Sequence, residues 1–161
     1  MLSPNGFGGV NFGASPDETI AYVTSSLGAP TEDSGWIDSF SIYGTCPLPA
    51  VRGVHWGSLV ALFTRAGTDF AAQDVEHFFS YYYASNLAPA IGLGTAANIF
   101  IGSSRADLDS AYAGSLEVVD DEFDTFWRAD AFGMSQLYGF LSGPLPGDLV
   151  ESINGGLGCG E

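Results

Sequence analysis

The stretch VNFGASPDETIAYVTSSLGAP, residues 10–30, decides the fold of the first half of the chain, because it carries every signal of a helix and of its two ends. Ser15 is a favoured N-cap, Pro16 suits the first helical position, and Glu18 stands where a capping box places an acidic residue. Gly28 is a typical helix terminator. Apolar residues recur between these ends at helical spacing, at Ile20, Val23 and Leu27. We therefore predict an amphipathic helix that begins at Pro16 and is closed by Gly28.

A shorter version of this pattern, IFIGSSRADLDSAYAG, recurs at residues 99–114. Ser104 takes the N-cap position, Asp107 takes the third helical position, and Gly114 ends the segment. In both stretches an apolar or aromatic pair leads into a glycine two residues before the capping serine. The recurrence predicts a second helix, related to the first as in a tandem repeat.

Strand patterns follow each predicted helix. In the first half the best ones are residues 54–64, with Gly57 as a bend or bulge, and residues 76–84, in which aromatic side chains alternate. Residues 31–53 are rich in turn-forming residues, and we expect a long loop there with one short strand near residues 40–43. Four short strands are expected in the second half, at residues 116–119, 124–129, 136–142 and 149–153.

These patterns predict an α+β fold of two tandem repeats, each a short helix followed by an antiparallel β-meander, with the helices packed on one face of the sheet. A length of 161 residues suits a single domain. We place the first repeat at about residues 10–90 and the second at about residues 91–161 of that domain.

The charge of the chain is extreme: 19 acidic residues stand against four arginines and no lysine, for a net charge of −15. Nucleic acids and anionic membranes are poor partners, because phosphate binding needs clusters of Lys and Arg. The acidity fits solubility in a saline habitat, attraction to a basic partner, or binding of divalent cations. The sequence has no run of about 20 apolar residues, so we predict no direct membrane span.

Two cysteines, Cys46 and Cys159, lie far apart in glycine-rich, turn-like surroundings. This usage predicts a disulfide and an extracellular or cell-envelope location, and the alternative is two buried free thiols in a cytosolic protein. His55 and His77 do not give these cysteines the paired spacing of a zinc site, and we predict no metal and no cofactor. Because no signal peptide is visible, we expect that an export leader preceding Met1 has been removed.

Several motifs fit a structural interpretation better than a chemical one. The formal G-x-G-x-x-A at residues 92–97 lacks a preceding strand and a following helix, so we interpret it as a connector. The acidic cluster at residues 120–124 lacks the spacing of a calcium loop, and we interpret it as a solvated turn between strands. The sequence has no nucleophile-elbow motif, and His55 and His77 lie in strand patterns. We therefore predict no catalytic residue.

Aromatic side chains are the strongest hint of a binding function. Tyr and Trp on a rigid sheet are the usual material of interaction hot spots, and also of ordinary cores. We expect about half of them in the core and the rest on a contact surface of the sheet. The candidates for that binding surface are Trp36, Tyr43, Trp56, Phe79, Tyr81 and Tyr83.

The two Gly-x-Ser helix starts, at residues 12–15 and 101–104, and the Leu-Gly-Ala-Pro at residues 27–30 give the chain a resemblance to a known repeat. It resembles the repeat of β-lactamase inhibitory protein and of the small outer-membrane assembly lipoproteins, in which such a run opens a short helix before an antiparallel sheet. Residues 150–161 also resemble uncharacterised secreted or lipid-anchored domains of actinobacteria. The resemblance implies the architecture and an exported location. Because the single candidate disulfide and the long first-half loop depart from the inhibitor, no inhibitory residues are carried over.

The sequence thus predicts a non-catalytic, exported domain that binds a protein or an envelope component at the cell envelope or outside the cell. One alternative is a small hydrolase that uses His55 or His77 with an acidic partner between the two halves. The other is a self-assembling structural envelope protein, in which aromatic strand edges pair between copies.

Overall fold

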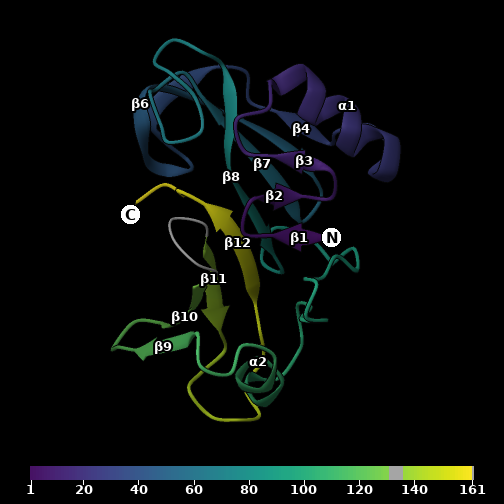
Figure 1. Ribbon diagram of the computed structural model, residues 1–161, viewed down its shortest axis with the longest axis vertical. Coiled ribbons are helices and arrows are strands. Elements are labelled where there is room, and N and C mark those ends of the chain that lie inside the picture. Colours follow the sequence, from purple (N-terminus) through teal and green to yellow (C-terminus); the bar gives the residue numbers. More distant parts are fainter. Residues whose placement is uncertain (131–135, 161) are drawn as a thin grey trace.

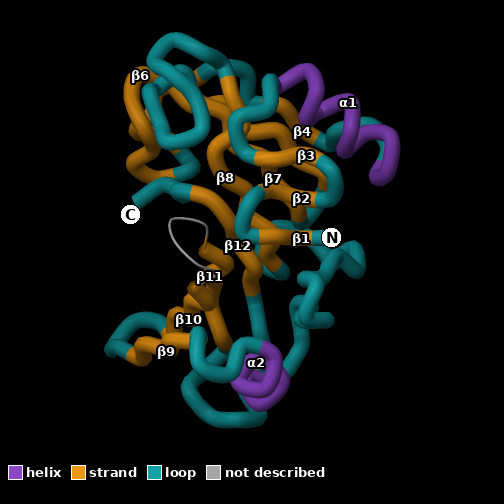
Figure 2. Tube along the Cα trace, viewed as in Figure 1, coloured by secondary structure: helices purple, strands orange, loops and turns teal. Residues whose placement is uncertain are grey.

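The computed structural model describes residues 1–130 and 136–160, and this part of the chain is mostly antiparallel β-sheet (Figure 1). Its helices are α1 (Pro16–Leu27) and α2 (Arg105–Ala111). Its strands are β1 (Leu2–Ser3), β2 (Gly6–Phe7), β3 (Val10–Asn11), β4 (Glu32–Asp33), β5 (Ile37–Ser41), β6 (Gly44–Trp56), β7 (Leu59–Thr64), β8 (His77–Ala84), β9 (Leu116–Asp120), β10 (Thr125–Asp130), β11 (Gln136–Leu141) and β12 (Ser152–Gly156). Strands run the length of the molecule, whereas the helices lie at two separate places on it (Figure 2).

One nine-stranded sheet forms the body of the protein. Its strands follow the order β4-β6-β7-β8-β12-β11-β10-β9, and β5 also pairs with β6. The strand pairs are antiparallel, a geometry that short turns can connect. The first three strands form a separate small antiparallel sheet.

The prediction of two tandem helix-plus-meander repeats is wrong. β12, which follows all the other strands in the sequence, lies between β8 and β11, so residues 10–90 and 91–161 contribute to one continuous sheet. Asn154 of β12 pairs with Tyr82 on one side and with Tyr138 on the other. The recurring pattern in the sequence is a local capping signal, whereas strand pairing is decided by contacts between residues far apart in the chain.

The single strand predicted at residues 54–64 is also wrong, because a hairpin occupies this stretch. β6 ends at Trp56, β7 begins at Leu59, and Gly57 lies in the turn between them with a φ of 62°. Glycine adopts this conformation without steric cost, so the residue expected to bend the strand reverses the chain instead. The long loop predicted at residues 31–53 is replaced by β4, β5 and most of β6.

Other strand predictions are confirmed. Residues 76–84 contain β8, and the four strands predicted in the second half correspond to β9, β10, β11 and β12. β12 begins at Ser152, three residues later than the expected start. Turn residues bounded these segments clearly, which is why their positions could be predicted.

Both helices start at the predicted residue, but only the Ser15 half of the capping box predicted at α1 is present. The Ser15 Oγ accepts a hydrogen bond from the Glu18 backbone N–H over 3.3 Å at the start of α1. At α2 the capping box is complete, since Ser104 and Asp107 each bind the other's backbone N–H. Within residues 1–130 and 136–160, no helix combines the length and the apolar character needed to cross a membrane.

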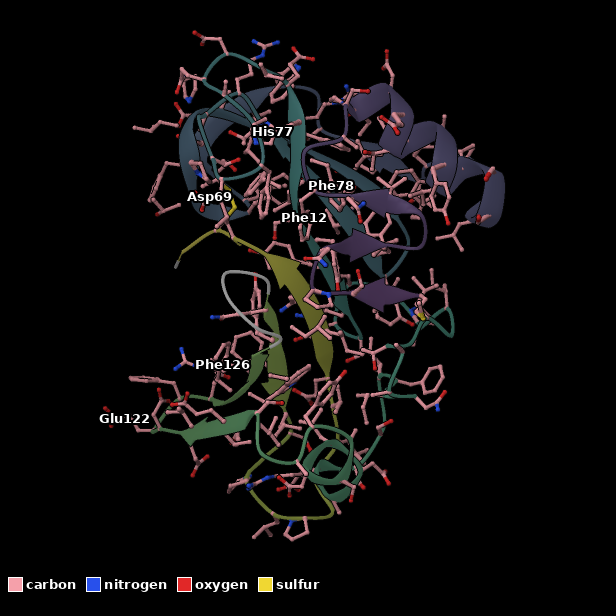
Figure 3. The ribbon with its side chains drawn as sticks, in the orientation of Figure 1. Phe12, Asp69, His77, Phe78, Glu122 and Phe126 are labelled. Carbon is pink, nitrogen blue, oxygen red and sulfur yellow. A yellow bond between two sulfur atoms is a disulfide. The ribbon has the colours of Figure 1, made fainter. Side chains whose placement is uncertain are left out.

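The main sheet buries one of its faces under the helices and the N-terminal strands. The register aligns a row of buried side chains on this helix face: Trp56, Leu59, Tyr83 and Ile153. Val23 of α1, Leu108 of α2 and Phe7 of β2 belong to the same core cluster. Phe12 lies against Phe78 of β8, with ring centroids 4.8 Å apart (Figure 3). A single apolar core therefore joins both helices to the sheet.

The opposite face of the sheet, here called the groove face, carries the alternate residue of each strand. The register aligns one row of these side chains across six strands: His55, Val60, Tyr82, Asn154, Tyr138 and Arg128. A second, smaller apolar cluster lies on this face, with Leu62 and Phe79 packed near the Cys46–Cys159 disulfide. The predicted disulfide is thus confirmed, with an S–S distance of 2.01 Å and a sequence separation of 113 residues.

Candidate binding site

A groove of about 570 Å³ opens on the groove face, a volume within the range of ligand-binding pockets. Ile42 and Tyr43, at the connection between β5 and β6, line it together with Ala84, the last residue of β8, and residues 85–87, which follow that strand. Asp124 and Glu151 add two carboxylates to its lining. The strands of the sheet contribute His55, Val60, Tyr82, Phe140, Ser152 and Asn154.

Tyr43 is held at the groove by contacts that fix its ring. Its hydroxyl lies 2.9 Å from the Nε2 of His55, at hydrogen-bonding distance. The ring lies directly over Gly53, where a Cβ atom would come within 2.2 Å of Cζ. Burial lowers the pKa of His55 and raises the pKa of Tyr43, so both groups are held in their neutral forms at neutral pH. The pair therefore forms a rigid, uncharged part of the groove lining.

Most polar groups around the groove are used inside the fold. The Tyr82 hydroxyl accepts a hydrogen bond from the Cys159 N–H over 2.8 Å. The Ser152 Oγ accepts one from the Phe140 N–H over 2.9 Å. These bonds hold β8, β11 and the segment after β12 in place, and they leave these two side chains with a structural role.

Asn154 is the exception among these polar groups. It lies in the middle of the sheet, is 2% exposed and lines the groove. Its Oδ1 is buried and has no hydrogen-bond partner among the described residues. Leaving a buried polar atom unsatisfied costs about 1–3 kcal/mol. Among the described residues, five other buried side-chain polar atoms also lack a partner, but Asn154 is the one of these six residues that lines the groove.

The cationic side chains of the protein are engaged elsewhere. Each of the four arginines forms an ion pair, namely Arg52 with Asp33, Arg65 with Glu76, Arg105 with Asp109 and Arg128 with Glu117. None of these arginines lines the groove, and the chain has no lysine. The carboxylates of Asp124 and Glu151 therefore give the groove a negative charge that no arginine or lysine of the chain neutralises.

The six aromatic residues predicted to form a binding surface lie in three different environments. Tyr43 lines the groove. Trp36 is half-buried, and the guanidinium of Arg65 lies 4.4 Å from its ring centroid. The other four are buried in the core, with at most 3% exposed, so they cannot form a contact surface in this fold: Trp56, Phe79, Tyr81 and Tyr83.

His77 is one of the two histidines considered for a hydrolase, and both of its ring nitrogens have hydrogen-bond partners inside the protein. Its side chain is buried, its Nδ1 lies 2.7 Å from the Val75 carbonyl oxygen, and its Nε2 lies 2.7 Å from the Thr68 hydroxyl. Figure 3 shows it at the start of β8, near the loop that carries Asp69. His55 lies in the groove, apart from His77, and its Nε2 is bonded to Tyr43. The structure therefore does not bring the two histidines into one site.

The acidic cluster at residues 120–124 is organised as a turn. The Asp121 Oδ1 accepts hydrogen bonds from the backbone N–H groups of Phe123 and Asp124, over 2.8 and 3.0 Å. Glu122 lies at the outer end of the β9–β10 hairpin, away from Phe126 (Figure 3). Among the described residues, no group of three His, Cys, Asp or Glu side chains could hold a metal ion.

The predicted connector at residues 92–97 lines the edge of the small N-terminal sheet. The Leu2 N–H donates to the Gly94 carbonyl over 2.8 Å, and Leu2 forms an isolated bridge with Thr95. This segment lies outside the groove lining. Gly94 therefore serves backbone pairing in this fold, whereas nothing lies within 4 Å of the Cβ position of Gly92.

Sequence reasoning missed the polar part of the groove. Asn154 lies in the run Ser-Ile-Asn-Gly-Gly, a composition that resembles a turn more than a central strand. Phe140 alternates with Leu141 and Gly139, so its position facing the groove depends on the register with β10 and β12. The available signal was the alternation in residues 136–142, which places Tyr138 and Phe140 on one face.

Comparison of the chain with protein-family models, with curated proteins and with solved structures finds no match. The resemblance to the inhibitor and lipoprotein repeats is therefore a prediction that these comparisons do not test. The function has to be argued from the groove itself.

Proposed function

We propose that this protein is a non-catalytic, exported domain that binds a ligand in the groove on its sheet, at the cell envelope or outside the cell. The groove carries the proposal, because it combines aromatic and apolar walls with a few polar groups. This is the usual composition of a binding site on a rigid scaffold. The nearby disulfide is consistent with an extracellular location, since such bonds persist in oxidising compartments.

Several features favour binding over catalysis. The Nε2 of His55 is hydrogen-bonded to the Tyr43 hydroxyl, which gives this histidine a structural partner. His77 is hydrogen-bonded through both ring nitrogens. A catalytic triad needs a nucleophile that is hydrogen-bonded to a histidine, and a carboxylate that is hydrogen-bonded to the same histidine. The described residues of the groove do not form this arrangement. The hydrolase alternative keeps one observation in its favour, the presence of His55 and two acidic residues in the same groove lining, but no described serine or threonine of the groove is hydrogen-bonded to His55.

The proposal is tested by probing immobilised protein with arrays of oligosaccharides and of random peptides. The groove variant carries Ile42→Ser and Leu87→Ser, both at exposed apolar positions in the lining. The matched control carries Val75→Ser and Leu145→Ser, which are exposed apolar positions outside it. We expect probes that bind the wild type and the control but bind the groove variant at least about tenfold more weakly. The proposal is wrong if no probe binds the wild type, or if the groove variant binds as well as the control does.

A further inference from the structure

We infer that the groove binds an arginine side chain presented by an extended segment of a partner protein. This inference rests on the proposed function and names its ligand. Three independent features of the groove carry it, namely its carboxylates, the unsatisfied Asn154 and its aromatic walls.

The first feature is the charge of the groove. Asp124 and Glu151 line it, and the four arginines of the chain are paired with other carboxylates. Carboxylates accept hydrogen bonds and are best satisfied by a cationic donor. A net charge of −15 also attracts basic segments over a distance and repels acidic ones. The occupant that complements the groove is therefore cationic.

The second feature is the amide of Asn154. Its Oδ1 is buried and unpartnered among the described residues, although its side chain is 2% exposed and lines the groove. This observation does not depend on the carboxylates, and an N–H donor of a ligand in the groove would satisfy the Oδ1. A ligand with several N–H groups in a fixed arrangement can serve an amide oxygen and a carboxylate at the same time.

The third feature selects arginine over lysine. Tyr82 and Phe140 contribute aromatic rings to the same lining. A guanidinium is planar, carries five donors and stacks on aromatic faces, whereas an ammonium is a compact and strongly hydrated charge. The combination of aromatic rings, an amide oxygen and carboxylates therefore fits a guanidinium best.

Apolar side chains around the groove indicate that the arginine belongs to a peptide segment. Ile42 is 77% exposed and Leu87 is 47% exposed, and both line the groove. Phe123, next to Asp124, is 83% exposed. A small free cation would leave these side chains in water, whereas neighbouring residues of a peptide would cover them.

The test uses a synthetic array of random octapeptides with a fixed central residue. Each sequence is made with arginine, with lysine and with citrulline, which keeps the shape of arginine but has no charge. The best binders are then measured in solution by fluorescence anisotropy, at low and at high salt. We expect arginine peptides to bind about tenfold more tightly than their citrulline versions, and lysine peptides to fall between them.

Two double variants that change the net charge by the same amount distinguish binding in the groove from attraction by the overall charge of the protein. Asp124→Asn with Glu151→Gln changes the groove, and Glu18→Gln with Asp69→Asn changes exposed positions outside its lining. Each pair removes two negative charges, from −15 to −13. We expect the groove pair to weaken arginine-peptide binding by about tenfold and the control pair by less than about twofold. Equal weakening by both pairs would overturn the inference in favour of non-specific charge attraction.

Asn154→Leu provides a readout that a purely structural asparagine would not give. Removing an unsatisfied polar group leaves the urea midpoint unchanged or raises it, whereas binding of arginine peptides falls by about tenfold. A lower midpoint with unchanged binding would contradict the assigned role.

If oligosaccharides bind the groove and peptides do not, or if citrulline peptides bind as tightly as arginine peptides, this inference fails while the proposed binding function stands. If no probe depends on Ile42 and Leu87, both fail.

Discussion

The helix face and the groove face of the sheet are built by the same strands, yet they use similar residues in different ways. Tyr81, Tyr82 and Tyr83 follow one another in β8, and the outer two point to the helix face, where both are fully buried. The Tyr81 hydroxyl donates to the Ser3 carbonyl, and the Tyr83 hydroxyl accepts from the Ile91 N–H, so both tie the covering segments to the sheet. Tyr82 points the other way and lines the groove. Burial, and not residue type, decides which aromatic side chains are available to a ligand.

The two faces also differ in what closes them. The helix face is covered by packing, with α1, α2 and the N-terminal strands in one apolar cluster. The groove face has only a small cluster beside the disulfide, and much of its central row is polar or partly exposed. The comparison predicts that stability resides mainly on the helix face and binding mainly on the groove face.

Loss of the disulfide should produce the largest effect. Replacing Cys46 and Cys159 with Ala releases a loop closed over a separation of 113 residues. The chain-entropy description of disulfides gives a loss of about 4–5 kcal/mol in the free energy of unfolding. Urea unfolding followed by tryptophan fluorescence, with and without reductant, measures it. If the double variant unfolded at the same urea concentration as the oxidised wild type, the groove face would be stabilised by packing and not by the disulfide.

A matched pair of phenylalanine substitutions compares the faces directly. Phe78 is fully buried on the helix face and contacts the rings of Phe7, Phe12 and Phe63, so Phe78→Ala should cost about 3–5 kcal/mol of unfolding free energy. Phe140 is only half-buried on the groove face, so Phe140→Ala should cost less than about half as much. Peptide binding should follow the reverse order once Phe78→Ala is assayed under conditions where it is folded. Equal stability losses in urea unfolding would remove the distinction between the faces.

Gly53 tests whether the position of Tyr43 is built into the sheet. In Gly53→Ala the new methyl group would meet the Tyr43 ring at 2.2 Å, so the ring has to leave its place against His55. Overpacking of this kind costs about 1–3 kcal/mol. Gly147→Ala is the control, because nothing lies within 4 Å of its Cβ position. NMR spectra of the His55 ring should change only in the first variant, and identical spectra for both would show that Tyr43 does not depend on Gly53.

The smallest expected effect is the response of stability to mild acid. Burial lowers the pKa of His55 below its ordinary value of 6.5, in spite of the opposing charge of Glu32. The unfolded chain therefore binds the proton first as the pH falls below about 6.5, so stability declines there and levels off below the folded-state pKa. In His55→Gln this decline should be smaller, as measured by urea unfolding between about pH 8 and about pH 5. A variant with the same pH profile as the wild type would contradict the prediction.

Asp33 provides an internal reference at lower pH. Its hydrogen bonds with Arg52 hold its pKa below the ordinary value of 3.8. The contribution of Asp33 to the free energy of unfolding is therefore complete above about pH 3.8. It is lost as the pH falls through the folded-state pKa of Asp33. The Asp33 window lies below the His55 window, so the two contributions can be separated in one titration.

Local signals in the sequence were sufficient for some elements of this fold. Ser15, Gly28 and Ser104 mark helix ends, and turn residues bound β8, β9 and β10, because capping and turn chemistry depend on neighbours in the chain. The disulfide could be predicted because only two cysteines are available to pair. These predictions required no knowledge of how distant segments meet.

The topology and the groove depended on contacts that the sequence does not display. The insertion of β12 between β8 and β11 joins residues about 70 positions apart, and no local pattern marks it. The groove residues Tyr82, Asn154 and Phe140 come together only through that pairing. The run Glu76–Ala84 has aromatic side chains on both faces, so its alternation could not show which face was open. The burial of Tyr81 and Tyr83 and the exposure of the groove were therefore beyond sequence reasoning.

The place of β12 in the sheet has a consequence for the order of folding. A nascent chain that has reached residue 151 contains β8 and β11 but lacks the strand that holds them together. The sheet can close only after residues 152–156 have emerged, and the disulfide can form only after Cys159 has followed them. Long-range pairing of this kind folds slowly and leaves strand edges exposed in the meantime. Until β12 is in place, the edges of β8 and β11 that pair with it stay open.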